Sequence, residues 1–196
     1  MRYVVVDLEA TCWLKGSTRD RMEIIEIGAV QLSSAAGPAV NEFGAFVRPV
    51  LEPILSDFCR ELTHIEQADV DGAAPFPEVL SRFLAWIGTE PFVLCSWGAY
   101  DLHQFETDCR RHELPLPPTF RKHVNLKAEF AQQRAVRPCG MARALAILEL
   151  PLEGTHHRGI DDARNIGRIA PFVLPAVEAR DGLDGTSRNE GTHAVR

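Results

Sequence analysis

Apolar residues follow two different periods along the chain, and the change of period separates strands from helices. Residues 2–8, RYVVVDL, are apolar on both faces, which is typical of a strand buried in the middle of a sheet. Residues 24–32 and 41–47 are further apolar runs, separated by the turn-forming segment SSAAGP at 33–38. Three successive strands of this kind predict an antiparallel meander.

A helical period follows the third strand. The apolar positions of residues 76–87 recur every three or four residues, so we expect a helix with one buried face that ends at Gly88. Residues 92–96 form a short apolar run that predicts a buried strand. The apolar positions of residues 102–109 return to helical spacing. This strand, loop and helix in succession imply a parallel strand in the same sheet.

The rest of the chain completes a mixed α/β domain. We expect a last short strand at 124–126 and helices at 141–148 and 161–173. After residue 178 the chain becomes rich in Gly, Asp, Ser, Thr, Asn and Arg, a composition that buries little apolar surface. We therefore assign residues 1–178 to one folded domain and residues 179–196 to a flexible tail.

Composition excludes several classes of protein. The 196 residues are 45% hydrophobic and 24% charged, which is an ordinary globular balance and argues against wholesale disorder. The apolar runs are much shorter than the roughly 20 residues of a membrane-spanning helix, so we expect no membrane partner. Asp7 and Glu9 interrupt the apolar stretch that a secretory signal would need, so the expected location is cytoplasmic.

Cysteine usage and charge narrow the choice further. The five cysteines are an odd number without a C-x-x-C pair, which disfavours a disulfide framework and a thiolate zinc site, so we interpret them as reduced thiols. The net charge of −6 argues against nonspecific nucleic-acid binding through a basic surface. A nucleic-acid substrate held by bound metal and a local basic patch stays possible.

The first candidate chemistry lies at the end of the first predicted strand. Asp7 and Glu9 are two residues apart, so the two-residue period of a strand places both carboxylates on one face, beside Tyr3 and Val5. Two buried like charges are costly unless a cation or strong donors compensate, and a divalent metal is the simplest compensation. The alternative interpretation is a strand end that emerges into solvent.

Further carboxylates occur near two other predicted elements. Asp101 follows a buried strand, where open α/β sheets often place their sites, although an acid at a helix start is an alternative explanation. Asp162 shares a helical stripe with Ile166 and Ile169 and should face the sheet. Asp161 lies on a polar stripe and is better suited to a first-turn charge.

These motifs together resemble the DEDDh 3'-to-5' exonucleases of the ribonuclease-H-like superfamily, and most of all the Eri-type exoribonuclease branch. The D-x-E motif appears in VVDLEATC at residues 5–12, the second motif in WGAYD at residues 97–101, and the third as His157 five residues before Asp162. The resemblance spans about residues 2–172. It implies a mixed five-stranded sheet flanked by helices. The flanking segments that also agree are EIIEIGAV at 23–30, LTHI at 62–65 and VNLK at 124–127.

The resemblance implies a two-metal hydrolysis of phosphodiester bonds that releases nucleoside 5'-monophosphates. Asp7, Glu9, Asp101 and Asp162 would be the ligands of two Mg²⁺ or Mn²⁺ ions, which prefer such hard oxygen donors. His157 would be the general base toward the attacking water, since neutral imidazole accepts a proton near pH 7. The neighbouring His156 competes for that role.

Substrate contacts are implied less firmly. By resemblance, Ala10, Thr11 and Trp13 are candidates to contact the terminal nucleotide, with Trp13 either stacking on a base or packing in the core. The expected substrate is a single-stranded or 3'-overhanging nucleic acid, with RNA favoured. Glu26 is interpreted as a structural acid and Asn165 as polar helix surface. Candidates for a phosphate track, any of which can equally be a solvated surface charge, are Arg19, Arg21, Arg110, Arg111, Arg121 and Lys122.

Two other functions compete with this interpretation. The segment DLEAT at residues 7–11 also resembles the D-x-D-x-T loop of haloacid-dehalogenase-type phosphatases, but Glu9 replaces the second Asp and that chemistry leaves His157 and Asp162 without a role. A non-catalytic binding module on the same fold would not require all five site residues. A magnesium-dependent nuclease assay separates the three hypotheses.

Overall fold

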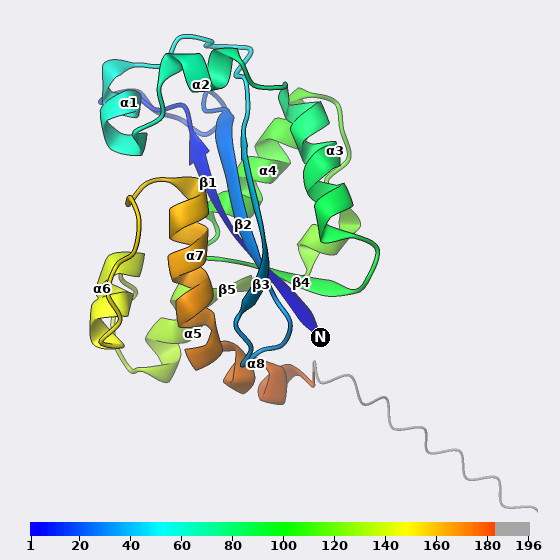
Figure 1. Cartoon of the computed structure of the whole chain (residues 1–196), viewed down its shortest axis with the longest axis vertical. Helices are drawn as coiled ribbons and strands as arrows, with labels where there is room; N and C mark the ends of the chain where they lie inside the picture. The colour runs from blue at the N-terminus through cyan, green and yellow to red at the C-terminus, as the bar shows by residue number, and fades with distance from the viewer. Residues whose placement is uncertain (183–196) are drawn as a thin grey trace, which may run out of the picture.

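The computed structural model describes residues 1–182, and there a five-stranded sheet lies between two layers of helices (Figure 1). The strand order is β3-β2-β1-β4-β5, with β1 antiparallel to β2, β2 antiparallel to β3, and both β4 and β5 parallel to their neighbours. The predicted meander and the predicted parallel strand are confirmed. The strands are β1 (Arg2–Ala10), β2 (Ile24–Leu32), β3 (Ala39–Phe46), β4 (Phe92–Ser96) and β5 (His123–Asn125).

The helices follow the predicted pattern where the apolar stripe is long. The helix predicted at residues 76–87 is α3, and the one predicted after Asp101 is α4. Four short helices, α1, α2, α5 and α8, were not predicted from the pattern. The helices are α1 (Asp57–Thr63), α2 (Gln67–Asp71), α3 (Phe76–Ile87), α4 (Tyr100–Arg111), α5 (Leu126–Gln133), α6 (Met141–Ile147), α7 (Gly159–Ile169) and α8 (Leu174–Asp181). Within the described residues, no helix has the length and apolar character needed to cross a membrane.

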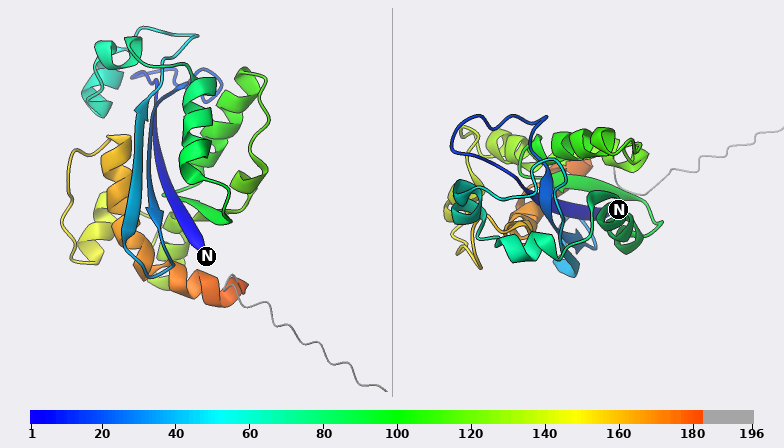
Figure 2. Two further views of the ribbon diagram at one scale, coloured as in Figure 1. Left: turned by 45° about the vertical axis from the view of Figure 1, so that its right-hand side comes forward. Right: turned by 90° about the horizontal axis from the view of Figure 1, so that it is seen from above.

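The sheet is covered on both faces because its central strands are apolar on both (Figure 2). On one face, Tyr3 and Val5 of β1 pack in a cluster with Ile166 of α7 and residues of α5, α6 and α8. On the other face, Val4 and Val6 pack in a second cluster with α3 and α4. Each such side chain removed from water contributes roughly 1.5–3 kcal/mol, so β1 is held firmly between the two layers.

Helix α7 approaches the sheet at two glycines. A Cβ on Gly28 of β2 would lie 2.0 Å from the backbone carbon of Gly159, the first residue of α7. A Cβ on Gly159 would lie 3.1 Å from the carbonyl oxygen of Asp7. Only hydrogen atoms fit between the strands and the start of the helix, and this fixes where α7 presents its first turn.

The predicted boundary between domain and tail needs a correction. Helix α8 runs through Asp181, so residues 179–181 are helical. Arg180 pairs with Glu129 of α5 at 2.9 Å, and Glu178 accepts a hydrogen bond from the Tyr3 hydroxyl at 3.1 Å. These contacts and the buried Leu174 hold α8 against the domain where the sequence alone indicates only polar chain. The remainder of the predicted tail, residues 183–196, lies outside the described residues.

Candidate active site

The end of β1 carries two carboxylates on one face of the sheet. Asp7 and Glu9 continue the row of Tyr3 and Val5, and Glu9 is buried. On the neighbouring strand β2, Gly28 lies directly opposite Asp7 and Glu26 lies directly opposite Glu9. The strand therefore passes from an apolar row into an acidic one on the same face, as the two-residue period predicts.

Two helices bring further carboxylates to this point. Asp101, in the first turn of α4, accepts a hydrogen bond from the Leu8 N–H of β1 at 3.0 Å. Asp162, in the first turn of α7, is buried, and one oxygen each of Asp7, Glu9 and Asp162 lie within 4.8 Å of one another. Asp162 faces the sheet, as the helical stripe predicts. Asp161 points away and pairs with Arg164 at 2.8 Å.

The four carboxylates open into one cavity of about 290 Å³. The same cavity is bordered by residues that the sequence analysis did not name as candidates. Trp97 and Tyr100 come from the segment that carries the second motif, so that motif was a usable signal for them. Gly140 and Met141, at the start of α6, had no local signal. The lining is completed by Leu8, His156 and His157.

The two neighbouring histidines have different contacts. His156 donates from Nδ1 to Asp162, with 2.8 Å between the nitrogen and Oδ2. His157 donates its backbone N–H to the same carboxylate at 3.1 Å, in a left-handed conformation with φ of 64°. Its ring stacks on the His156 ring with 4.0 Å between centroids and has no hydrogen bond to any described residue. One imidazole therefore holds Asp162 while the other faces the cavity with its nitrogens available.

The site concentrates negative charge where water is scarce. Burial, followed by the nearby Asp101 and Glu9, raises the pKa of Asp7 well above its usual range. Burial and then Asp162 raise the pKa of Glu9 to about 9. Burial raises the pKa of Asp101 to about 6, against the opposing Leu8 N–H. The cluster is thus an unbalanced set of oxygen donors, for which a hard divalent cation supplies the missing positive charge.

Two polar residues brace the start of α7. Glu26 accepts hydrogen bonds from the Gly159 N–H at 3.0 Å and from Arg158 at 3.2 Å, so its predicted structural role is confirmed. The prediction for Asn165 is wrong, because this side chain is fully buried. It donates to the Glu153 carbonyl at 2.7 Å and accepts from the Glu153 N–H at 3.1 Å. Asn165 thereby fastens the loop that carries both histidines.

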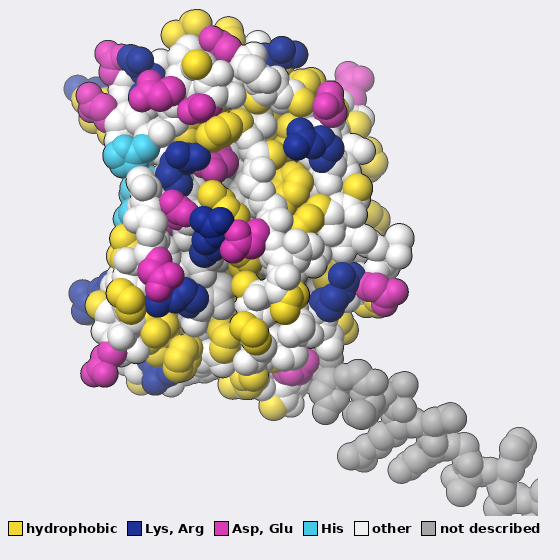
Figure 3. Space-filling model, viewed as in Figure 1, with side chains coloured by type: hydrophobic (Ala, Val, Ile, Leu, Met, Phe, Trp, Pro, Cys, Tyr) yellow, Lys and Arg dark blue, Asp and Glu magenta, His cyan; other side chains and the backbone are white. Residues whose placement is uncertain are grey.

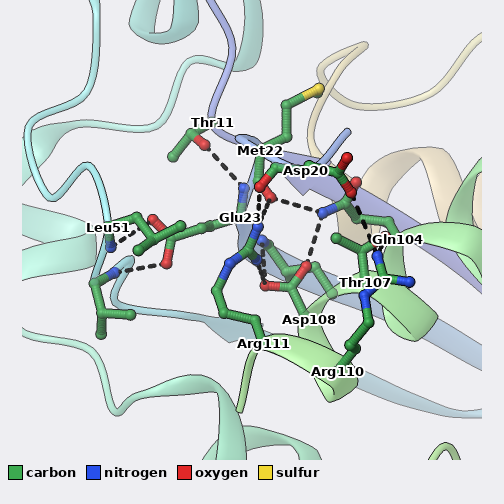
Figure 4. A network of polar contacts seen from close by, with 12 residues as sticks. Thr11, Asp20, Met22, Glu23, Leu51, Gln104, Thr107, Asp108, Arg110 and Arg111 are labelled. Atoms are coloured by element: carbon green, nitrogen blue, oxygen red, sulfur yellow. Dashed lines mark hydrogen bonds and ion pairs between the residues drawn. The ribbon is translucent and has the colours of Figure 1, made fainter. Parts of the chain in front are cut away.

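The predicted substrate contacts, Ala10 at the end of β1 and Thr11 and Trp13 just after it, do not line the cavity. The Thr11 hydroxyl accepts a hydrogen bond from the Glu23 N–H at 2.9 Å, within a buried network that extends to α4 (Figure 4). Arg21 covers the Trp13 ring, with its guanidinium carbon 4.0 Å from the ring centroid. In this arrangement the Thr11 side chain is structural, and its backbone N–H donates to the Glu23 carbonyl at 2.8 Å.

Several of the basic candidates have intramolecular partners. Arg111 pairs with the buried Asp108 at 2.7 Å and donates to the Met22 carbonyl at 2.9 Å, so it braces the chain before β2 (Figure 4). Arg21 pairs with Glu52 at 2.5 Å. On the face seen in Figure 3, basic and acidic side chains are interspersed, and no large basic patch is seen there.

Comparison with known proteins decides the family. The model of the RNase_T exonuclease family matches residues 4–170, which include every carboxylate and histidine of the cavity. The chain belongs to this exonuclease family. The alternative of a haloacid-dehalogenase-type phosphatase is therefore wrong, because its motif would occupy only the end of β1 and this match extends through α7.

Relatives within the exonuclease family include Eri-type proteins, which confirms that resemblance. The chain is 35% identical over 189 residues to ERI1 exoribonuclease 2 of Mus musculus, covering 85% of this chain and 28% of that protein. It is 32% identical over 200 residues to 3'-5' exoribonuclease 1 of Homo sapiens, covering 97% of this chain and 55% of that protein. The chain therefore spans little more than a quarter of the first relative and about half of the second.

A solved structure agrees with the fold over almost the whole chain. The nuclease domain of 3'hExo, a DEDDh family member bound to rAMP, is 30% identical with a TM-score of 0.82 and 92% coverage of both chains. The cell-death related nuclease CRN-4, at 22% identity and a TM-score of 0.80, shares the fold. The predicted ribonuclease-H-like sheet flanked by helices is confirmed.

Proposed function

We propose that this chain is a metal-dependent 3'-to-5' exonuclease that hydrolyses phosphodiester bonds at the 3' end of RNA or single-stranded nucleic acid and releases nucleoside 5'-monophosphates. The observation that carries the proposal is the convergence of four carboxylates from β1, α4 and α7 on one cavity, with the His157 imidazole beside them. Membership of the exonuclease family supports the same reaction.

The donor set fits a pair of Mg²⁺ or Mn²⁺ ions. Asp7, Glu9, Asp101 and Asp162 offer only oxygen, and burial raises the pKa of all four. When bound, two such ions would activate the attacking water and stabilise the charge on the leaving oxygen. The carboxylates would hold the ions and, through the rigid β1, fix their place relative to the histidines.

His157 is the general base in this proposal. Its ring faces the cavity without a hydrogen-bond partner among the described residues, and burial followed by the nearby His156 lowers its pKa. A larger share of the ring is then neutral near pH 7 and ready to take the proton of the attacking water. His156, bonded to Asp162, would orient that carboxylate.

RNA is the favoured substrate. Both similar curated proteins are named exoribonucleases, and the similar solved domain is bound to rAMP. In this chain the backbone of Ala10 and Thr11 lies directly after the carboxylates of β1 and would meet the terminal nucleotide. Trp13 would contribute by stacking if Arg21 moves off its ring. A cytoplasmic location stays a prediction.

The test is digestion of a 5'-labelled single-stranded RNA, with a DNA of the same sequence in parallel. We expect a ladder that shortens from the 3' end, nucleoside 5'-monophosphates on chromatography, and no turnover in excess chelator. Faster digestion of RNA than of DNA would support the substrate preference. Dominant internal cleavage, or full activity in chelator, would refute the mechanism, and a folded protein without turnover would favour a binding module.

A pair of variants tests the general base. His157→Ala should lower turnover roughly 10²- to 10⁴-fold, the contribution of a positioned base, and leave Mn²⁺ affinity measured by calorimetry nearly unchanged. His156→Ala should keep more of the turnover and weaken Mn²⁺ binding, because Asp162 loses a hydrogen bond. The reverse result would assign the base to His156.

A further inference from the structure

Two thiols lie in one buried cluster near the end of β1, outside the residues that line the cavity. Cys12 follows β1 and Cys59 belongs to α1, and both are buried in a small cluster with Ile25 and Ile65. Cys12 is 8% exposed and Cys59 is fully buried, so solvent reaches the pair from the Cys12 side. Neither thiol has a role in the proposed hydrolysis.

The backbones of the two cysteines are joined through one hydroxyl. The Ser56 hydroxyl donates to the Cys12 carbonyl at 2.6 Å, and the Ser56 hydroxyl oxygen accepts a hydrogen bond from the Cys59 N–H at 3.0 Å. The Cys59 thiol lies 3.7 Å from the carbonyl oxygen of Ala10. The Ser56 bridge therefore brings the two main chains together, and both side chains belong to one buried cluster, which is the proximity that a disulfide requires.

The two thiols differ in acidity. Hydrogen bonding from Cys12 lowers the pKa of Cys59 to about 7, whereas the same contact raises the pKa of Cys12. Isolated buried thiols elsewhere in the chain behave differently. Burial raises the pKa of Cys95. Burial, followed by the nearby Asp108, raises the pKa of Cys109 to about 11. Cys59 is thus the thiol with the most thiolate character among these four.

We propose that Cys12 and Cys59 form an oxidation site that a small peroxide converts into a disulfide. The Cys59 thiolate attacks a peroxide oxygen, the O–O bond breaks, hydroxide leaves and takes up a proton to become water, and Cys59 becomes a sulfenic acid. The Cys12 sulfur then attacks the Cys59 sulfur, the S–O bond breaks, and water leaves. In total two thiols and one hydrogen peroxide yield one disulfide and two waters, with sulfur oxidised and peroxide reduced.

The disulfide would act on the active site through Ala10. Closing the pair to the S–S bond length of about 2.05 Å draws α1 and the chain after β1 together. It also removes the Cys59 S–H from the Ala10 carbonyl. This step rests on the proposed function, in which the backbone of residues 10–11 meets the terminal nucleotide. A displacement there of about 1 Å can cost up to about 100-fold in rate, so oxidation should inhibit.

The first experiment detects the bond without any activity assay. The folded full chain is treated with a molar excess of hydrogen peroxide, quenched by alkylation, and mapped by mass spectrometry. We expect a Cys12–Cys59 linked peptide and a higher melting temperature, because a cross-link between distant residues restricts the unfolded chain. The linkage should persist in Cys139→Ser, a variant of the partly exposed cysteine, and be absent from Cys59→Ser. Absence of the linkage in the wild type would overturn the proposal.

The second experiment asks whether the bond controls turnover. RNA digestion is measured before oxidation, after oxidation and after dithiothreitol, each variant relative to its own reduced rate. We expect at least a tenfold loss in the wild type, recovery on reduction, and little loss in the Cys12→Ser/Cys59→Ser double variant. A mapped disulfide with an unchanged rate would overturn the link to the active site. An inactive reduced protein would refute the proposed function instead, while the mapping still decides the oxidation site.

Discussion

Replacing Gly28 by alanine should damage both the fold and the active site. The added Cβ would lie 2.0 Å from the Gly159 carbon and 2.2 Å from the Ile160 nitrogen, whereas carbon atoms in good contact are about 3.5–4.0 Å apart. The obstructing atoms belong to a helix backbone and cannot rotate away. The start of α7 must therefore move by roughly 1.5 Å, and Asp162 is in the same turn.

The expected cost follows from this displacement. Overpacking a tight site typically costs about 1–3 kcal/mol, and a backbone obstacle places Gly28→Ala near the upper value. Because Asp162 and His157 move with α7, we expect turnover to fall by roughly 10²-fold in protein that is still folded. Urea unfolding measures the free energy of unfolding, and initial rates of RNA digestion measure the loss of turnover.

The matched control is Gly44→Ala on the neighbouring strand. Gly44 pairs directly with Gly28, but its added Cβ would lie 3.6 Å from the Ile160 Cβ, an ordinary contact. Alanine within a strand is favoured over glycine by roughly 0.5–1 kcal/mol, so this variant should be neutral or slightly stabilised. Equal effects of the two substitutions, or wild-type stability and rate in Gly28→Ala, would refute the close-packing argument.

Three further predictions test other parts of the structure. Asp162→Ala should abolish turnover while Asp161→Ala keeps much of it, since only Asp162 lies in the cavity; equal initial rates would contradict this. Burial raises the pKa of Asp108 from its usual value near 4 to about 6 in the folded protein. The folded state therefore gains stability from protonated Asp108 below about pH 4, and this gain is lost as the pH rises through 6. Asp108→Asn should flatten the decline of unfolding free energy with pH across that window, and a parallel decline would contradict it. Asn165→Ala should cost about 1–3 kcal/mol in urea unfolding because it leaves buried backbone groups unpaired, whereas Arg164→Ala, which breaks exposed ion pairs, should cost less than about 1 kcal/mol; a reversed order would be inconsistent with the structure.

The fold could be predicted where the apolar period is long or the chain is clearly interrupted. The bounds of β2, α3 and β4 agree with the sequence because continuous apolar runs or a full helical stripe end at turn-forming residues. Helix α1 escaped prediction because it is short and buries only Cys59 and Thr63, which make no stripe. Its start depends on the Ser56 cap, a tertiary neighbour of Cys12.

The site could be predicted where the period of a strand or a helix decides which way a side chain faces. The strand period placed Asp7 with Glu9, and the helical period separated Asp162 from Asp161. Met141 escaped because it reaches the cavity through a long connection that no local pattern describes. Asn165 was misjudged because a polar stripe was taken to face solvent, whereas the loop before α7 folds over it.

Because β1 is central in the sheet, we expect the strand and the histidine-bearing segment to open at different rates. The strand is bonded to β2 on one edge and β4 on the other, so we expect its amide hydrogens to exchange only when the whole domain unfolds. The histidine-bearing segment, residues 149–158, is largely exposed and is held by a few bonds to α7, so it should exchange through local opening. The two carboxylates of β1, Asp7 and Glu9, thus persist as long as the sheet does, while the proposed proton acceptor His157 can withdraw and return. In an enzyme that removes one nucleotide after another, this difference in local stability would let each product leave while the carboxylates of β1 stay in place for the next nucleotide.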